Sequence, residues 1–340
     1  YDTITTDADG KATSKALPYG TYTVTELRGD ANEGYKLVAS FEVFVGENEK
    51  TYSYILEDKV ISMMIKLVKV DAGTGKTISV AGTVFRVEDS TGKEVKFDLL
   101  YPQPHTLSEF TTDESGTLFL PGTLPVGEYT LYEVSAPVTY LLNTEPVKFT
   151  VSEGSATNQV VTVKLKDTTV KGTISIEKKG EQLTGYTSDE TKYGMKYIPV
   201  YEMKGLQGVV YQIIAAENIG TLDGTVYYRA GETVCELTTD ANGLAASPKL
   251  YLGKYYIVEK KTVSGMVLDT TQHEVTLSYA DQHTAIVTES LALENQRQKA
   301  ALDITKTAEY FDYDTGTFYT DYGAGFIFGL YTKNAVGDIP

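Results

Sequence analysis

LPVGEYTLYE, at residues 124–133, is one of three copies of the pattern Leu-x-x-Gly-x-Tyr-x-x-x-Glu, and the other two occupy residues 17–26 and 250–259. In each copy a glycine-bounded turn predicts that a strand follows. Side chains alternate along a strand with period 2, so Tyr129, Leu131 and Glu133 share one face. A glutamate therefore stands where a third apolar residue is expected. Its recurrence in all three copies indicates that it has a partner inside the fold.

Two further strands of each repeat carry a polar residue on the apolar face. The opening strands have an inward lysine, at Lys69, Lys178 and Lys306. The closing strands have an inward acid or amide, at Asp58, Asp167 and Asn295. Burial of a lone charge costs several kcal/mol or shifts the pKa of the group until it neutralises. We therefore expect each repeat to gather one Lys, one Glu and one Asp or Asn.

The repeats also predict the domain organisation. Residues 61–168 and 169–297 are interpreted as complete domains, the latter with an insertion near 180–205 that forms a hairpin or a long loop. Residues 1–60 are interpreted as the C-terminal half of a domain and 298–340 as the N-terminal half of another. Joining residue 340 to residue 1 restores the spacing of the repeats. The sequence is therefore interpreted as one period of a tandem array. One alternative is that separate chains complete each other's split domain by strand addition, and another is that the sequence is an arbitrary fragment.

Composition favours strands over helices. The 340 residues include 30 Gly and 26 Tyr but no Trp, and no long segment has helical periodicity. Many short strands joined by glycine turns are typical of β-sandwiches. The predicted fold class is all-β, with tandem Ig-like antiparallel β-sandwich domains in an elongated array. Short linkers are expected near residues 59–62, 168–172 and 296–300.

Charge and cysteine content limit the partners and the stabilising chemistry. The formal net charge of −16 argues against nucleic acid or an anionic membrane as a partner, because both require a basic surface. Cys235 is the only cysteine, so no disulfide can form within the chain. No apolar run is long enough to span a bilayer, and neither a signal peptide nor an initiator Met is present. We expect an internal or processed piece of a longer protein.

In these residues the chain resembles the collagen-adhesin B-type (CnaB) domains, also called SpaA-like domains, of Gram-positive surface adhesins and pilins. The shared motifs are Lys69-Val70-Asp71, the Gly-x-Tyr-x-x-x-Glu strand, Ala136-Pro137 followed by Tyr140, and the closing Leu-x-Asn/Asp. The resemblance covers the whole chain. It implies that the Lys and the Asn or Asp of each domain join spontaneously as an isopeptide bond, with the Glu as catalyst.

Carried over residue by residue, the resemblance implies three triads. These are Lys69, Glu133 and Asp167; Lys178, Glu259 and Asn295; and Lys306, Glu26 and Asp58 across the join. Two of the acceptors are Asp, which loses water where Asn loses ammonia. The third unit has Lys178-Lys179-Gly180 in place of Lys-x-Asp, which makes Lys179 an alternative donor. An unreacted, hydrogen-bonded ion cluster is the alternative to the bond.

Other signals are weaker. Residues 7–10 resemble the beginning of a calcium loop, but the required Glu is missing, and Asp113 and Asp240 recur in equivalent turns, which favours turn chemistry. The three histidines are scattered and form no cluster with Cys235, so no metal and no cofactor are expected. The tyrosine-rich segments 186–201 and 310–322 favour packing between neighbouring domains over ligand binding.

The expected function is structural. The resemblance implies a stalk or fibre-shaft segment of an adhesin or pilus-like protein, located outside the cell and attached to the cell wall. Its partners would be neighbouring repeats or subunits of the same fibre, with a host surface ligand as a further possibility and no membrane insertion. The alternative is a module that itself binds a host matrix protein or glycan. An enzyme that acts on external substrates is not expected, because only self-catalysed bond formation is implied.

Overall fold

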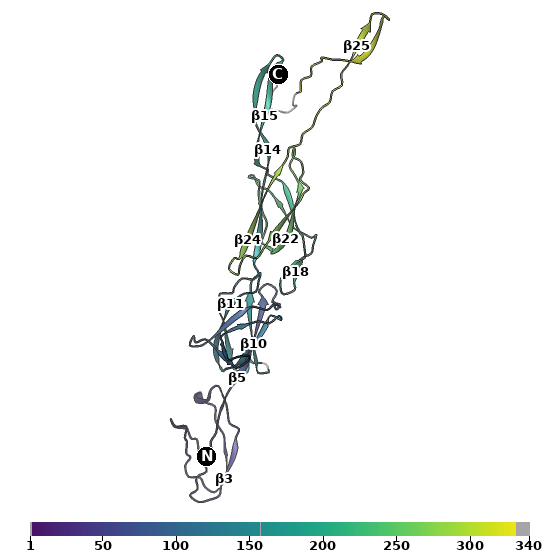
Figure 1. Cartoon of the computed structure of the whole chain (residues 1–340). Coiled ribbons are helices and arrows are strands. Elements are labelled where there is room, and N and C mark those ends of the chain that lie inside the picture. Colours follow the sequence, from purple (N-terminus) through teal and green to yellow (C-terminus); the bar gives the residue numbers. More distant parts are fainter. Residues whose placement is uncertain (1, 157, 331–340) are drawn as a thin grey trace.

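The structure, a computed structural model, describes residues 2–156 and 158–330. It is an elongated row of β-rich units, with β3 near one end and β25 near the other (Figure 1). Helical structure in the described residues is limited to two short 3-10 turns, η1 (Asp30–Asn32) and η2 (Glu153–Ser155). None of the helices described could cross a membrane. The predicted fold class, tandem β-sandwich domains in an elongated array, is confirmed.

The first complete sandwich packs a three-stranded sheet, in the order β10-β5-β13, against a four-stranded sheet, in the order β12-β11-β6-β9. Its strands are β5 (Ser62–Asp71), β6 (Val84–Asp89), β7 (Phe97–Leu99), β8 (His105–Leu107), β9 (Glu109–Thr111), β10 (Thr117–Pro125), β11 (Gly127–Ser135), β12 (Val147–Val151) and β13 (Val160–Asp167). Burial alternates along β13 as period 2 predicts, with Val161, Val163, Leu165 and Asp167 all inward. The core therefore lies between the two sheets.

The second sandwich repeats this arrangement. In one sheet the central strand β14 pairs with β15, β20, β21 and β24. This sheet faces the sheet β19-β16-β22-β23. The strands are β14 (Lys171–Thr191), β15 (Gly194–Gly205), β16 (Val210–Ala215), β17 (Ile219–Gly220), β18 (Val226–Tyr228), β19 (Thr233–Thr238), β20 (Leu244–Ala246), β21 (Leu250–Tyr251), β22 (Gly253–Lys261), β23 (Gln272–Leu277) and β24 (Ile286–Asn295). Its core includes Ile174, Ile176, Tyr255 and Ile257.

One pairing in each sandwich differs from the antiparallel expectation. The first and last strands lie side by side in parallel, with β13 against β5 and β24 against β14. Leu165 is level with Lys69, and Leu293 is level with Lys178. The chain thus enters and leaves each sandwich on adjacent strands that run in the same direction. A period-2 pattern specifies which face of the sheet a residue occupies, but it does not specify the direction of the neighbouring strand.

A glycine turn fixes the backbone beside each lysine. Gly116 has a φ of 71°, and a Cβ there would come within 1.8 Å of the Ile78 carbonyl oxygen. Its own carbonyl accepts a hydrogen bond of 3.0 Å from the Lys69 N–H. Gly243 repeats this role, because its carbonyl accepts a bond of 2.7 Å from the Lys178 N–H. Each glycine is needed because its left-handed conformation and close approach exclude a side chain.

The aspartates at the start of these turns make backbone hydrogen bonds. Asp7 accepts from the N–H groups two and four residues ahead, at 3.0 and 2.9 Å. Asp113 and Asp240 do the same in their turns. These contacts are the Asx-type geometry expected of a turn, so they support turn chemistry over a calcium loop.

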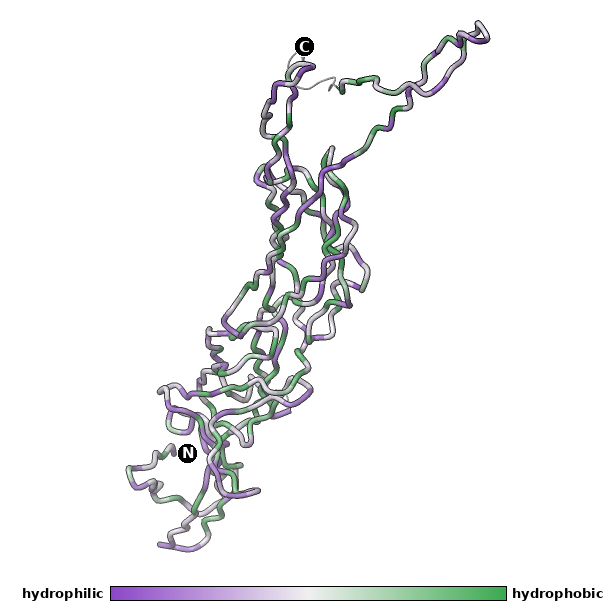
Figure 2. Tube along the Cα trace, turned by 45° about the horizontal axis from the view of Figure 1, so that its top comes forward, coloured by the Kyte–Doolittle hydropathy of each residue, from purple (hydrophilic) through white to green (hydrophobic). Residues whose placement is uncertain are grey.

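Within residues 2–60 and 298–330, the described parts of the two ends, the strands form only small sheets. The N-terminal end has β1 (Gly20–Val24), β2 (Tyr35–Lys36), β3 (Phe41–Val45) and β4 (Lys59–Val60), and the C-terminal end has β25 (Thr307–Asp312) and β26 (Thr317–Tyr322). The expected closing strand that ends at Asp58 and the expected opening strand that ends at Lys306 are not formed. Each lacks the neighbouring strand that its counterpart has in a complete sandwich. Hydrophobic segments nonetheless continue into both ends (Figure 2).

The two sandwiches are joined by polar contacts. The Thr74 hydroxyl donates to Asp223, and the Lys76 ammonium lies 3.0 Å from the Thr225 hydroxyl. On the other side of the junction, Gln282 accepts backbone hydrogen bonds of 2.9 and 2.8 Å from residues 136 and 142. A cavity of about 80 Å³, lined by residues of both sandwiches such as Thr139 and Leu222, is smaller than the roughly 300–1,000 Å³ of small-molecule pockets. The junction therefore fastens one sandwich to the next at two separate places.

Candidate functional site

The first sandwich brings Lys69, Glu133 and Asp167 together in its core. Lys69 on β5 and Asp167 on β13 belong to one sheet, and Glu133 on β11 reaches them from the other sheet. The Lys69 Nζ lies 2.5 Å from Glu133 Oε1 and in contact with Asp167 Oδ1. All three side chains are 0% exposed. The sequence-predicted triad is therefore assembled here as a water-excluded cluster.

Burial dominates the electrostatics of this cluster. It raises the pKa of Asp167 to about 7, because a carboxylate loses its hydration there; Lys69 opposes the rise and the charge of Glu133 adds to it. Glu133 is held in place by a hydrogen bond of 2.8 Å from the Asn143 N–H to its Oε2. The Lys69 contacts are close ion pairs without aligned hydrogen bonds. The amine thus faces a carboxyl group that is partly protonated at neutral pH.

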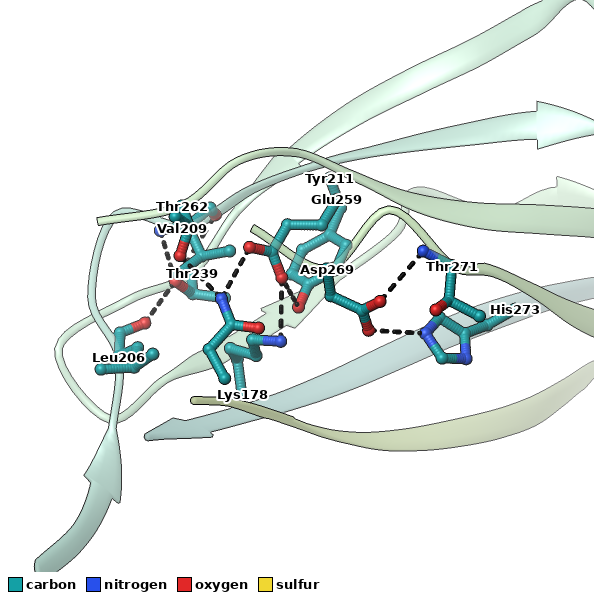
Figure 3. A network of polar contacts seen from close by, with 11 residues as sticks. Lys178, Leu206, Val209, Tyr211, Thr239, Glu259, Thr262, Asp269, Thr271 and His273 are labelled. Carbon is teal, nitrogen blue, oxygen red and sulfur yellow. Dashed lines mark hydrogen bonds and ion pairs between the residues drawn. The ribbon is translucent and has the colours of Figure 1, made fainter. Parts of the chain in front are cut away.

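The second sandwich assembles the same triad with an amide acceptor (Figure 3). Lys178 Nζ lies 2.8 Å from Glu259 Oε2, and the Asn295 amide nitrogen donates a 2.7 Å bond to Glu259 Oε1. The same nitrogen donates a 2.7 Å bond to the Thr262 hydroxyl. Among the described residues, Asn295 Oδ1 has no hydrogen-bond partner. Lys179, the alternative donor, lies outward with a 43% exposed side chain that pairs with Glu177, so the geometry favours Lys178.

The two clusters differ in the groups around the glutamate. In the first sandwich the Phe85 ring lies 5.7 Å from the Lys69 Nζ and offers no donor. In the second, Tyr211 takes the same place at 5.9 Å, and its hydroxyl donates a 3.3 Å bond to Glu259 (Figure 3). Burial and the nearby carboxylate raise the pKa of Tyr211, so it stays a donor. The amide site thus has hydroxyl groups that the acid site lacks.

The third triad is not brought together within one chain. Glu26 accepts bonds of 2.8 Å from the Asn32 side chain and from the Val38 N–H. Burial raises the pKa of Asp58, and the neighbouring Glu26 carboxyl group adds to this rise. Lys306 is exposed and directly precedes β25, at the opposite end of the molecule from β3 (Figure 1). The structure therefore joins two members of this triad and separates the third.

The motif residues beyond the triads have a separate role. Asp71 accepts bonds from the N–H groups of Gly73 and Thr74, and the buried Tyr140 hydroxyl donates to it at 2.9 Å. This pair shapes the turn that reaches the next sandwich. In the second sandwich the equivalent positions are Gly180 and Met266, and the chain continues as the β14–β15 hairpin. The departure from Lys-x-Asp is thus explained by the hairpin.

Sequence reasoning missed Tyr211, Thr262 and Asn143. The position of Tyr211 could have been predicted from the sequence. Tyr211 stands three residues after Gly208, as Phe85 stands three residues after Gly82, so the two residues occupy equivalent positions in their units. Thr262 had a similar signal, three residues after Glu259, where the first sandwich has Ala136. Asn143 acts through its backbone N–H, which no side-chain pattern can indicate.

Comparison with known proteins places this architecture in a family. Residues 1–60, 63–169 and 195–290 match the SpaA model, described as the prealbumin-like fold domain. The chain belongs to the SpaA family. The three matched ranges overlap the first three units interpreted from the repeats, residues 1–60, 61–168 and 169–297. No curated protein sequence matches the chain.

The chain is also similar to solved structures. The Bacillus anthracis TIE protein matches with a TM-score of 0.52 and 23% identity, over 86% of this chain and 45% of that one. The chain thus spans under half of the TIE chain. A Streptococcal ancillary pilin (TM-score 0.27, 18% identity, 84% and 77% coverage) and the shaft pilin SpaA of Lactobacillus rhamnosus GG (0.25, 13%, 71% and 100%) also match.

Proposed function

We propose that this chain is a load-bearing shaft segment of a Gram-positive surface adhesin or pilus-like protein, with Lys–Asp and Lys–Asn isopeptide bonds inside its domains. The observation that carries the proposal is the pair of buried triads, in each of which the Glu contacts both the lysine and the acceptor, and the acceptor lies on the parallel strand next to that of the lysine. Membership of the SpaA family and the elongated array support it. The only chemistry that it requires is performed by the chain on itself.

The reaction balances without an external reagent. At the acid site the neutral Lys69 amine and the protonated Asp167 carboxyl group become an amide and one water. At the amide site the Lys178 ammonium and the Asn295 amide become an amide and one ammonium ion. The neutral amine adds to the acceptor carbonyl carbon, while Glu133 or Glu259 takes the amine proton and returns a proton to the leaving group. Exclusion of water strengthens these interactions.

The parallel first and last strands give the bond its mechanical role. Tension that enters through β5 reaches Lys69 near the end of that strand, and it leaves through β13 just beyond Asp167. A covalent link between them carries the load past the roughly 100 residues in between. The same holds for β14 and β24 around Lys178 and Asn295. Such a domain transmits force without unfolding, which suits a shaft.

The shaft proposal includes completion of the split domain by the next repeat of the array. Val24 and Leu56 are 37% and 51% exposed, whereas their counterparts Leu131 and Leu165 are at most 1% exposed. Leu302 and Ile304, at the other end, are likewise 64% and 48% exposed. Gly10 has open space where Gly116 and Gly243 lie close to the backbone of another segment. Each end thus displays half of a core that the other end would cover.

A shaft and a ligand-binding module are separated by one experiment on the full chain. Small-angle scattering should show an extended rod in solution, and the same preparation should not bind immobilised matrix proteins or a glycan array. Saturable binding of one ligand that survives high salt would favour the adhesin alternative. A compact scattering profile would contradict the shaft directly.

The junction between the sandwiches should control the stiffness of that rod. Hydrogen bonds from Thr74, Thr221 and Thr225 lower the pKa of Asp223 to about 2 against the opposing effect of burial, so it is ionised at neutral pH. Asp223→Ala removes this acceptor and should widen the distribution of angles between the sandwiches. Distances between spin labels, one on each sandwich, measure this. Asp240→Ala, in a turn away from the junction, is the control and should leave the distribution unchanged.

The Tyr211 hydroxyl should accelerate bond formation at the amide site only. Tyr211→Phe recreates the ring found at the acid site and removes one donor to Glu259, so we expect the Lys178–Asn295 bond to form about tenfold more slowly. Loss of ammonia, followed by mass spectrometry during refolding, measures the rate. Loss of water at Lys69–Asp167 in the same molecule is the internal control. Equal slowing at both sites would assign Tyr211 a general packing role instead.

A further inference from the structure

The β14–β15 hairpin continues well beyond the second sandwich. Its strands pair from Lys179 and Gly205 out to Thr191 and Gly194, and it projects toward the end of the molecule that carries β25 (Figure 1). The strand pairing, with its bulge between Leu183 and Gly185, places a run of apolar side chains on one face, here named the hairpin face. Its members are Leu183, Tyr186, Met195, Tyr197 and Met203, each between 38% and 49% exposed. The hairpin face is therefore an apolar strip without a partner among the described residues.

The base of the hairpin shows which way this strip is turned. Tyr201 lies on the same face of β15 as Met195 and Tyr197, because the three are separated by even steps. The Tyr201 ring lies 3.7 Å from the Arg297 guanidinium, and Arg297 also pairs with Glu181 at 2.8 Å. Arg297 begins the segment that leaves the sandwich toward β25. The hairpin face therefore lies on the side where the next domain of the array begins.

The first sandwich provides a precedent for contact at this position. The segment between its first and second strands, residues 72–83, begins with a short turn at residues 72–76. That turn contacts the following sandwich, through Thr74 to Asp223 and Lys76 to Thr225. In the second sandwich the β14–β15 hairpin replaces this turn at the same place in the topology. The connection between first and second strands is thus already an interface between successive domains in this chain.

We infer that the hairpin face docks against the following domain, which residues 298–330 begin and residues 1–60 of a second copy complete. This inference rests on the proposed array, and it names the surface that holds one period to the next. The N-terminal half domain of that copy also has an exposed aromatic pair. Tyr19 and Phe44 pack edge to face at 5.4 Å and are 79% and 55% exposed. The hairpin is long enough to extend along the split domain and contact it, whereas the turn that follows Asp71 in the first sandwich is too short to do so.

The test compares the full chain, kept monomeric by dilution, with two full copies joined from residue 340 to residue 1. Amide hydrogen exchange is followed by mass spectrometry on peptides that cover residues 183–203. In the joined protein only the first hairpin has a following domain, so the peptide should split into two equal populations. One should exchange at the monomer rate and the other about tenfold or more slowly. The monomer should give one population.

A matched pair of double variants tests the face itself. Met195→Ser with Tyr197→Ser removes the hairpin face and should abolish the slow population. Ile198→Ser with Val200→Ser alters the opposite face, where the side chains are 37% and 38% exposed, and should retain it. Loss of the slow population in both variants, or in neither, would overturn docking through this face.

Exchange in residues 20–26 separates this inference from the array on which it rests. If the second copy's β1 becomes protected while the hairpin stays uniform, completion stands and the docking inference is overturned. The hairpin would then be free for a partner outside the array. If β1 gains no protection, the second copy completes nothing, and both proposals are overturned. Protection of both segments supports both.

Discussion

Glu133→Ala should leave the first sandwich without its crosslink and lower its unfolding temperature by roughly 20 °C or more. Glu133 is buried and contacts the Lys69 amine. Among the described residues, no other carboxylate of the opposite sheet makes an ion pair with that amine. Without Glu133, the amine proton has no acceptor apart from Asp167 itself. A crosslink that closes about 100 residues is worth about 4.7 kcal/mol in the chain-entropy model for disulfides. Calorimetry of the full chain should show one unfolding transition shifted and the other retained.

Two controls distinguish catalysis from general damage. Glu128→Ala removes an exposed acid from the same strand and should leave both the bond and the unfolding temperature unchanged. Asp167→Asn keeps the triad but changes the leaving group, so the site should lose ammonia instead of water. If Glu133→Ala protein still loses that water, Glu133 is not the catalyst, and the reading of all three glutamates fails.

Bond formation at Lys69–Asp167 should slow as pH rises through about 7, whereas formation at Lys178–Asn295 should show no decline that follows this pKa. Burial raises the pKa of Asp167 to about 7, and only the protonated carboxyl is a good electrophile. With a pKa of about 7, the protonated fraction falls from about one half at pH 7 to about one tenth at pH 8, so the rate should fall about fivefold over that unit and about tenfold over the next. The amide of Asn295 does not titrate in this range. Chain refolded from denaturant at several pH values, sampled by mass spectrometry, gives both rates.

The same shift sets the pH dependence of stability before the bond forms. The pKa of Asp167 is higher in the folded state than in the unfolded state, so the folded domain binds the extra proton. The contribution of Asp167 to the stability of the folded domain is therefore fully present below its unfolded-state pKa, near 4, and is lost as pH rises toward 7. Unreacted first sandwich should be least stable above pH 7. For the rate of bond formation, the same pH profile at both sites, or a rate at Asp167 that does not change with pH, would show that protonation of this carboxyl does not limit the reaction.

Period-2 alternation was enough to predict which residues meet in a complete domain. Lys69, Glu133 and Asp167 were each identified as an interruption of an apolar face, and burial of that face is what brings them together. Two features could not be read this way. The parallel placement of β5 and β13 depends on how the chain crosses between sheets, and Asn143 contributes only a backbone N–H.

The ends of the chain show the limit of local patterns most clearly. Leu302, Ile304 and Lys306 alternate as the opening strands of the other units do, yet they form no strand. Glu26 and Asp58 lie next to each other but lie at the far end from Lys306. A strand needs neighbours to satisfy its backbone groups, so an alternating pattern alone does not form one. The preference for Lys178 over Lys179 depends on which way β14 faces, which the local pattern does not specify.

The most direct test of covalent crosslinking is the intact mass of the full chain, combined with mapping of its crosslinked peptides. The mass should be lower than the sequence mass by one water and one ammonia. Digestion should release branched peptides that join Lys69 to Asp167 and Lys178 to Asn295, while Lys306 should be unlinked in the single chain. A chain with its full sequence mass, and linear peptides at both sites, would contradict the account and leave two buried ion clusters in place of the bonds.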